Sequence, residues 1–402
     1  MPTGAPSRPH LHLGVALEGA GAHPAAWRAT GAVEGLTGAE RLVRLARTAE
    51  RGLLDFVGLD DTFDPPAPGS AELPLRFDAL LALARVAPAT EAVGLVPTVT
   101  TTHTEPFHVS KNVATLDLVS AGRAGWRVAV STSAEAARRF GRKDPQPLAE
   151  LYEEAEDAIE VVSRLWDSWE DDAVIRDAAT GRYVDRDKLH YVDFEGRFFN
   201  VRGPSITPRS PQAQPLVVVD ATHPVAAELA GRRADIALVV ASTAADGRAQ
   251  REALRARATA AGRDPDTLAV LVTARIGEPG QRRALDALAG ERDPRGRQPD
   301  RGLDRGLDLD LDLVGTPAEV ADVLEGWFVE DAADGFLLRP DVLPGTLDWL
   351  VDEVVPLLRS RGRFRERYDG VTLRDRFALP RPANRYEHAK VSPVATVTGV
   401  SR

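Results

Sequence analysis

The sequence predicts a single (β/α)8 barrel of the α/β class. Short apolar runs alternate with amphipathic stretches along most of the 402 residues, and strands that alternate with helices favour a parallel sheet. About eight such units fit this length better as a closed barrel than as an open sheet. No segment has the composition of a linker between domains, so we expect one barrel over residues 8–380.

The apolar runs predict the strands and the amphipathic stretches predict the helices. Within residues 40–51, apolar side chains recur on one face, as in a helix that packs on a sheet, and Gly52 follows as a helix stop. The expected strands are residues 12–17, 56–59, 92–96, 125–131, 216–219, 236–240, 268–274 and 335–338. The expected helices are residues 40–51, 80–87, 109–120, 151–166, 225–233 and 347–358.

Three segments depart from this alternation. Residues 167–210 are polar and aromatic without a clear period, so we expect an insertion that shapes the substrate pocket. Residues 292–313 are of low complexity and rich in Asp and Leu, which predicts a solvated acidic loop. Residues 381–402 are expected to form a C-terminal tail that is mobile or that clasps a partner.

Composition excludes several classes of function. There are 50 Lys and Arg against 60 Asp and Glu, a net charge of −10, which gives no general attraction to nucleic acid or to an anionic membrane. The chain has no cysteine, which excludes thiolate metal sites and cysteine nucleophiles. Neither a signal peptide nor a long apolar span is evident, so we expect a cytoplasmic protein.

Polar residues gather where the predicted strands end, which is the catalytic face of a barrel. Asp60 and Asp61 end the second strand, where they either contact a ligand or form a turn or helix cap. The third strand leads into residues 98–104, which combine five threonines with His103 and offer small donors to a ring edge, a sugar or a phosphate. Ser131 and Ser133 follow the fourth strand, where they either cap the next helix or bind an anion.

Two further patterns are discounted. His10 and His12 have the spacing of a metal-binding pair, but they begin the first strand and so lie at the wrong end of the barrel. We therefore expect no metal. Gly19 and Gly21 look like half of a dinucleotide fingerprint, but Pro24 takes the place of the third glycine and no helix is expected there.

Several long motifs, in order, resemble the bacterial-luciferase-like flavin-dependent monooxygenases, in particular the nitrilotriacetate and desulfurization branch. The resemblance runs from about residue 11 to residue 384 and is specific for the family, but not for the substrate. Its motifs are GAHPAAWR (21–28), LDDTF (59–63), TTTHTEPFHVSK (100–111), TLDLVSAGRAGW (115–126), LWDSWEDDA (165–173), VGTPAEVAD (314–322) and VVPLLRSRGRFRERYDGVTLRDRF (354–377).

The resemblance implies a (β/α)8 enzyme that takes reduced FMN from a separate flavin reductase and uses O2 to oxygenate a small organic substrate. The flavin carries the chemistry while the protein holds it and excludes water. The resemblance also implies a homodimer or homotetramer. By motif position, Asp60 and Thr101 contact the isoalloxazine or ribityl region and Tyr152 reaches toward the phosphate. Ser131, Thr222 and His223 contribute to the same cofactor site, and His103, near the flavin face, is the catalytic candidate.

The sequence departs from the branch at its phosphate-binding positions. Arg127 replaces an asparagine and Leu148 replaces a histidine. The later strand is followed by Asp220-Ala221-Thr222-His223 in place of a glutamine-alanine-glycine run and a serine. Glycine lets backbone amides approach a phosphate closely, whereas Asp220 adds a like charge. We hypothesise that Arg127 and His223 supply compensating positive charge.

Three interpretations remain open at this point. The first is an FMN-dependent monooxygenase with a modified phosphate site. The second is an oxidoreductase of the same superfamily that uses the deazaflavin F420. The third is a non-catalytic, flavin-poor homologue that acts as a partner subunit.

Overall fold

The computed structural model describes residues 10–29, 31, 33–64, 75–290 and 311–387. Eight parallel strands close into a barrel, because β10 pairs with both β9 and β11. The order around the barrel is β1-β2-β3-β4-β9-β10-β11-β13, and β13 pairs with β1. The barrel strands are β1 (His12–Ala16), β2 (Phe56–Leu59), β3 (Gly94–Thr100), β4 (Gly125–Ala129), β9 (Leu216–Asp220), β10 (Ile236–Val239), β11 (Ala269–Gly277) and β13 (Gly335–Pro340). The fold class predicted from the sequence is confirmed.

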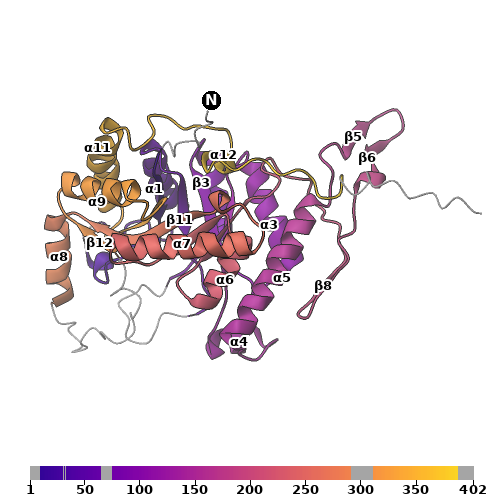
Figure 1. Cartoon of the computed structure of the whole chain (residues 1–402), viewed down its shortest axis with the longest axis horizontal. Coiled ribbons are helices and arrows are strands. Elements are labelled where there is room, and N and C mark those ends of the chain that lie inside the picture. Colours follow the sequence, from indigo (N-terminus) through magenta and orange to yellow (C-terminus); the bar gives the residue numbers. More distant parts are fainter. Residues whose placement is uncertain (1–9, 30, 32, 65–74, 291–310, 388–402) are drawn as a thin grey trace, which may run out of the picture.

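Helices surround the barrel (Figure 1). Those in the first half of the chain are α1 (Ala39–Arg51), α2 (Ala79–Val86), α3 (Pro106–Val119), α4 (Ala134–Phe140) and α5 (Leu148–Asp167). Those in the second half are α6 (Pro224–Arg233), α7 (Ala244–Ala260), α8 (Pro279–Gly290), α9 (Pro317–Val329), α10 (Gly345–Trp349), α11 (Val355–Ser360) and α12 (Leu373–Arg376). Short 3-10 turns lie at Ala26–Arg28, Ala87–Ala89, Arg186–Lys188 and Pro265–Thr267, and a π-helical turn at Leu350–Val354 joins α10 to α11.

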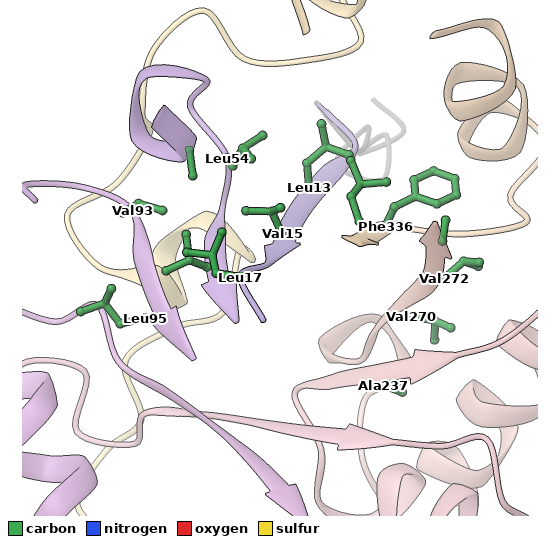
Figure 2. Close-up of a cluster of buried hydrophobic side chains, with 14 of the residues drawn as sticks. Leu13, Val15, Leu17, Leu54, Val93, Leu95, Ala237, Val270, Val272 and Phe336 are labelled. Atoms are coloured by element: carbon green, nitrogen blue, oxygen red, sulfur yellow. The ribbon is translucent and has the colours of Figure 1, made fainter. Parts of the chain in front are cut away.

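Alternation along the strands separates two cores. Outward-facing side chains such as Leu13 and Val15 of β1, Val272 of β11 and Phe336 of β13 pack into one buried cluster with the surrounding helices (Figure 2). Strand side chains point alternately to the two faces, so the residues between them face the barrel axis. The interior cluster contains Ala16, Phe56, Val96, Leu216, Val218, Ile236, Leu238, Leu271 and Leu337. Residues of α12 and of the segment after it (Leu373, Phe377, Leu379) belong to the same cluster.

Part of the expected acidic loop is a strand. Leu311–Val314 form β12, which pairs in parallel with Ala274–Gly277 of β11, and Leu313 is buried. The prediction of a solvated loop is therefore wrong at this end, because alternate Leu residues bury one face while Asp residues stay outside. Residues 292–310 of that prediction lie outside the described residues.

The expected insertion forms two antiparallel hairpins. The first contains β5 (Val174–Asp177) and β6 (Arg182–Val184), and the second β7 (Phe194–Glu195) and β8 (Asn200–Val201). The first hairpin projects away from the barrel (Figure 1). The start of the C-terminal tail binds this insertion, because Arg381 forms a bidentate ion pair with Asp171. The buried amide of Asn384 also donates to the carbonyl oxygens of Asp167 and Trp169.

None of the helices in the described ranges combines the length and the apolar character needed to cross a membrane.

Candidate active site

The C-terminal mouth of the barrel holds a cluster of charges on its inward face. Arg127 follows Gly125 by two residues on β4, and the Gly125 backbone lies against Val96 in the interior. Asp220 follows the interior residue Val218 on β9 by the same spacing. Because strand side chains alternate, both charged groups lie directly above the apolar interior.

The same alternation adds a residue from each of three other strands. Asp60 follows β2, Glu18 follows β1, and Arg339 lies near the end of β13. We call Glu18, Asp60, Arg127, Asp220 and Arg339 the mouth cluster. The sequence pattern indicated Asp60, Arg127 and Asp220 but not Glu18 and Arg339. Strand side chains alternate, so the residue two positions after an inward-facing one also faces inward, and this rule identifies both.

Arg127 is the electrostatic centre of the mouth cluster. Its Nη2 lies 3.3 Å from Asp220 Oδ2, and its Nη1 lies 3.8 Å from Asp60 Oδ1. Burial lowers the pKa of Arg127, but Asp60, Asp220 and Glu18 raise it by more. Burial, followed by repulsion from Asp60, raises the pKa of Glu18 above its ordinary value. Arg127 therefore supplies the positive charge beside Asp220 that we hypothesised from the sequence.

His223 forms a contact within its own loop. Its Nδ1 accepts a hydrogen bond from the amide of Val225 at 3.2 Å, so the imidazole caps the N-terminus of α6. Thr222 is also bonded within its own loop, because both its amide and its hydroxyl donate to Asp220 Oδ1. At this corner between β9 and α6, the two expected cofactor-binding residues satisfy groups of their own loop.

Two buried hydroxyls beside the mouth lack a partner. Thr98 Oγ1 on β3 and Ser131 Oγ after β4 have no hydrogen-bond partner within the part of the chain that the structure describes. Thr98 is 2% exposed and Ser131 7%. An unpaired buried hydroxyl costs about 1–3 kcal/mol, so these two groups indicate a polar ligand. Thr101 differs, because its hydroxyl donates to the carbonyl oxygen of Ala129 at 3.2 Å.

His103 lies in an aromatic wall. Its ring stacks on Phe140 with centroids 4.6 Å apart and planes 10° apart, and Phe63 packs edge-on against Phe140 at 4.6 Å. Burial, with a smaller effect of Lys143, lowers the pKa of His103, against an opposing effect of Asp64. A lowered pKa favours the neutral imidazole, which is the form that can accept a proton.

A cavity of about 410 Å³ adjoins the mouth cluster between α1 and α2. Glu18 and Asp60 of the mouth cluster are among its lining residues. Much of the remaining wall is apolar and includes Leu17, Leu42, Leu59 and Phe77. The cavity therefore has the size and character of a small-molecule site beside the mouth cluster.

Comparisons with known proteins agree with this geometry. The family model described as luciferase-like monooxygenase matches residues 20–335. The chain is 35% identical to nitrilotriacetate monooxygenase component A of Aminobacter aminovorans, over 93% of this chain and 97% of that protein. The chain belongs to the luciferase-like monooxygenase family.

Other relatives cover the chain as completely. N-acetyl-S-(2-succino)cysteine monooxygenase of Bacillus subtilis (strain 168) is 31% identical over 94% of this chain and 98% of its own length. The structure of EDTA monooxygenase from Chelativorans sp. BNC1 is similar with a TM-score of 0.79 and 27% identity, and covers 92% of this chain and 99% of that chain. As a luciferase-like monooxygenase, this chain is an oxygenase enzyme.

The residues of this luciferase-like monooxygenase fit one part of an FMN molecule and not another. Thr98 and Ser131 offer unpaired hydroxyls to a polar ring edge. The corner between β9 and α6 does not suit a phosphate, because Asp220 occupies it and Thr222 and Val225 have their amides engaged. The ring part of the cofactor fits, and the phosphate part does not.

Tyr152, another expected site residue, lies near the mouth cluster. Burial and the carboxylate of Asp220 raise the pKa of the half-buried Tyr152 on α5. Ser133 caps α4 by accepting from the amide of Ala136 and also donates to Asp64, so capping is its role here. Asp61 accepts from the amide of Ala79 at the start of α2.

The two discounted patterns have structural explanations. His12 lies at the opposite end of the barrel, where its Nδ1 bonds Asp55 and its ring stacks on Phe377. Gly21 has a φ of +129°, and a Cβ there would lie 2.4 Å from the carbonyl oxygen of Asp341. The glycine allows a close backbone approach and is not part of a nucleotide fingerprint.

Proposed function

We propose that this chain is the oxygenase component of a two-component monooxygenase. It takes a reduced flavin, with FMN as the expected form, from a separate flavin reductase and uses O2 to oxygenate a small organic substrate. The observation that carries the proposal is the pair of buried, unpaired hydroxyls of Thr98 and Ser131 beside the mouth cluster. Similarity to a relative named as component A of a monooxygenase supports the need for a separate reductase.

The chain's own residues have defined tasks in this proposal. A bound reduced flavin supplies the reaction with O2. Thr98 and Ser131 orient the polar edge of its ring, and Arg127 keeps the carboxylates of Asp60 and Asp220 from repelling one another. His103 presents a neutral imidazole beside Phe140 and excludes water there.

The substrate belongs, in this proposal, in the cavity between α1 and α2. Its size suits a small organic molecule and its walls suit an apolar body. Arg41 and Arg85 also line it, so the cavity offers positive charge to a substrate with one anionic end.

Anaerobic titration of the purified chain with reduced FMN tests the proposal, with reduced FAD and reduced F420 as comparisons. We expect binding of reduced FMN in the micromolar range, stoichiometric with the chain. Preference for F420 would replace the monooxygenase by a deazaflavin-dependent oxidoreductase. Failure to bind any of the three would overturn the proposal and favour a flavin-poor partner subunit.

A further inference from the structure

We infer that this chain holds its reduced flavin without using the 5′-phosphate as an anchor, and that it therefore binds riboflavin about as well as FMN. The inference rests on the proposed function and narrows its cofactor specificity. Its basis is the corner between β9 and α6, where Asp220 adds a carboxylate and the amides of Ala221, Thr222 and Val225 donate to acceptors of this chain.

Three backbone amides of the corner donate to acceptors of this chain. The amide of Ala221 donates to the carbonyl oxygen of Leu238 at 2.7 Å, and the amide of Thr222 donates to Asp220. Residue 224 is proline and has no amide hydrogen. The amide of Val225 donates to His223 Nδ1. These three amides are thus engaged within the chain, whereas a phosphate site needs such amides to be free.

Side chains in the groove beside the corner are also engaged. This groove, of about 430 Å³, lies between α6 and α7 and includes Thr222, Asp246, Gln250 and Arg257 among its lining residues. Arg257 Nε donates to Glu228 at 2.7 Å. Gln250 Nε2 donates to the carbonyl oxygen of Val240 and to Asp246. Asp246 adds a negative charge in the first turn of α7, where an anion would otherwise find a favourable helix dipole.

The remaining cations of α6 point to other partners. Arg232 and Arg233 both bind Glu156 on α5, and Arg233 also binds Glu160. Arg127 divides its guanidinium between Asp220 and Asp60. A phosphate dianion at the corner would lie beside two carboxylates, those of Asp220 and Asp246. The nearby arginines already share their positive charge with carboxylates of this chain: Arg127, Arg232, Arg233 and Arg257.

The flavin ring keeps its partners in this arrangement. Thr98 and Ser131 lie on the β3 and β4 side of the mouth, across Arg127 from Asp220. Binding energy then comes from the ring and the ribityl chain, which riboflavin and FMN share. Two charge-assisted hydrogen bonds to a phosphate would favour FMN by more than about a hundredfold, and we expect no such preference.

Anaerobic titrations of the full chain with reduced riboflavin and reduced FMN measure this specificity. We expect the two dissociation constants to agree within about threefold, since no phosphate contact separates them. A preference for FMN of about thirtyfold or more would overturn the inference and leave the proposed function intact. Absence of binding by both flavins would instead overturn the proposed function.

A charge variant gives a second, independent measurement. Asp220→Asn removes the carboxylate and its share of Arg127, which then pairs with Asp60 alone, so we expect FMN affinity to rise about tenfold while riboflavin affinity stays within about twofold. Glu252→Gln, an equal charge change at an exposed position on α7, should alter neither affinity. An unchanged FMN affinity in Asp220→Asn, with an unchanged melting temperature, would contradict the role given to this carboxylate.

Discussion

Arg127 Nη2 lies 3.3 Å from Asp220 Oδ2 at the barrel mouth, where strands β4 and β9 are neighbours. Each residue replaces one that the family pattern leads us to expect, and the two replacements meet in space. The arginine therefore compensates the charge that the aspartate introduces, and the mouth of the barrel carries an ion pair where the family pattern has neutral amides.

Removing the arginine should destabilise the protein in a pH-dependent way. Arg127→Gln leaves Asp220, Asp60 and Glu18 without their shared cation, and we expect a loss of about 1–2 kcal/mol at pH 8, since the side chains of Asp60 and Asp220 are partly exposed. Without the cation the pKa of Glu18 rises further above its ordinary value, so protonation of Glu18 relieves part of the repulsion and the loss shrinks as the pH falls toward 5.

Urea unfolding at pH 8 and pH 5 measures this dependence. The double variant Arg127→Gln/Asp220→Asn serves as the matched control, because it removes a positive and a negative charge together. It should recover part of the stability lost at pH 8. Equal losses at both pH values would show that the arginine contributes through packing alone.

Removing an unpaired hydroxyl should affect ligand binding without lowering the stability of the fold. Thr98→Val keeps the shape of the side chain and removes a buried hydroxyl that has no protein partner, so we expect unchanged or slightly higher stability. Flavin affinity should fall about threefold to tenfold, the loss of one hydrogen bond. Thr101→Val is the control: its hydroxyl already binds the carbonyl oxygen of Ala129, so stability should fall instead.

Calorimetry measures the stability of each variant, and anaerobic flavin titration measures its flavin affinity. Lower stability in Thr98→Val without any change in flavin affinity would mean that this hydroxyl serves the fold.

The pKa of His103 should control the acid limb of turnover. Lys143 lowers and Asp64 raises this pKa, with burial as the main cause of its downward shift. If the neutral imidazole handles a proton, Lys143→Gln should move the acid limb of kcat/KM to higher pH, and Asp64→Asn should move it to lower pH. Each shift should be about half a pH unit.

Turnover coupled to a flavin reductase measures these profiles once a substrate is found. His103→Phe preserves an aromatic ring beside Phe140 and should keep the melting temperature and flavin affinity while the acid limb disappears. Identical profiles in all three variants would rule out His103 as the group that titrates.

Asp55 should stabilise the fold far from the candidate site. This fully buried carboxylate accepts from Arg365 at 2.6 Å and from the amide of Leu13 at 2.7 Å, and it bonds His12. Burial raises the pKa of Asp55, but Arg365 and His12 lower it by more, well below its usual range. Asp55→Asn leaves Arg365 buried without its carboxylate, so we expect a loss of about 3–5 kcal/mol at pH 7.

The sign of its pH dependence follows from linkage. A depressed folded pKa stabilises the protein above the unfolded pKa of about 3.9, and this stabilisation is lost as the pH falls below that value. Guanidinium unfolding should therefore show a constant difference between wild type and Asp55→Asn from pH 7 down to about pH 4, and then a narrowing of about 1 kcal/mol by pH 3, because the folded pKa lies lower still. A difference that does not narrow between about pH 4 and pH 3 would contradict the assignment, and flavin affinity should not change at pH 7.

Much of the fold followed from local patterns in the sequence. The alternation of apolar runs with amphipathic stretches predicted the closed barrel, because each strand must bury its outer face under a helix. It failed at Leu311–Val314, where a repetitive Asp and Leu composition concealed a strand that only pairing with β11 stabilises. The sequence pattern also did not predict the helices α7, α8 and α9, in which few residues are buried.

The sequence by itself determined the family, the barrel and the polar strand ends that include Asp60, Thr101 and Ser131. Tertiary structure alone decided how those ends interact. Arg127 and Asp220 are 93 residues apart and meet because β4 and β9 are neighbours in a parallel barrel. The engagement of Thr222 and His223 within their own loop, and the lack of a partner for the Thr98 hydroxyl, depend on distances between atoms. A one-dimensional pattern gives the type of each group, whereas the availability of a hydrogen bond is fixed only when the chain closes around it.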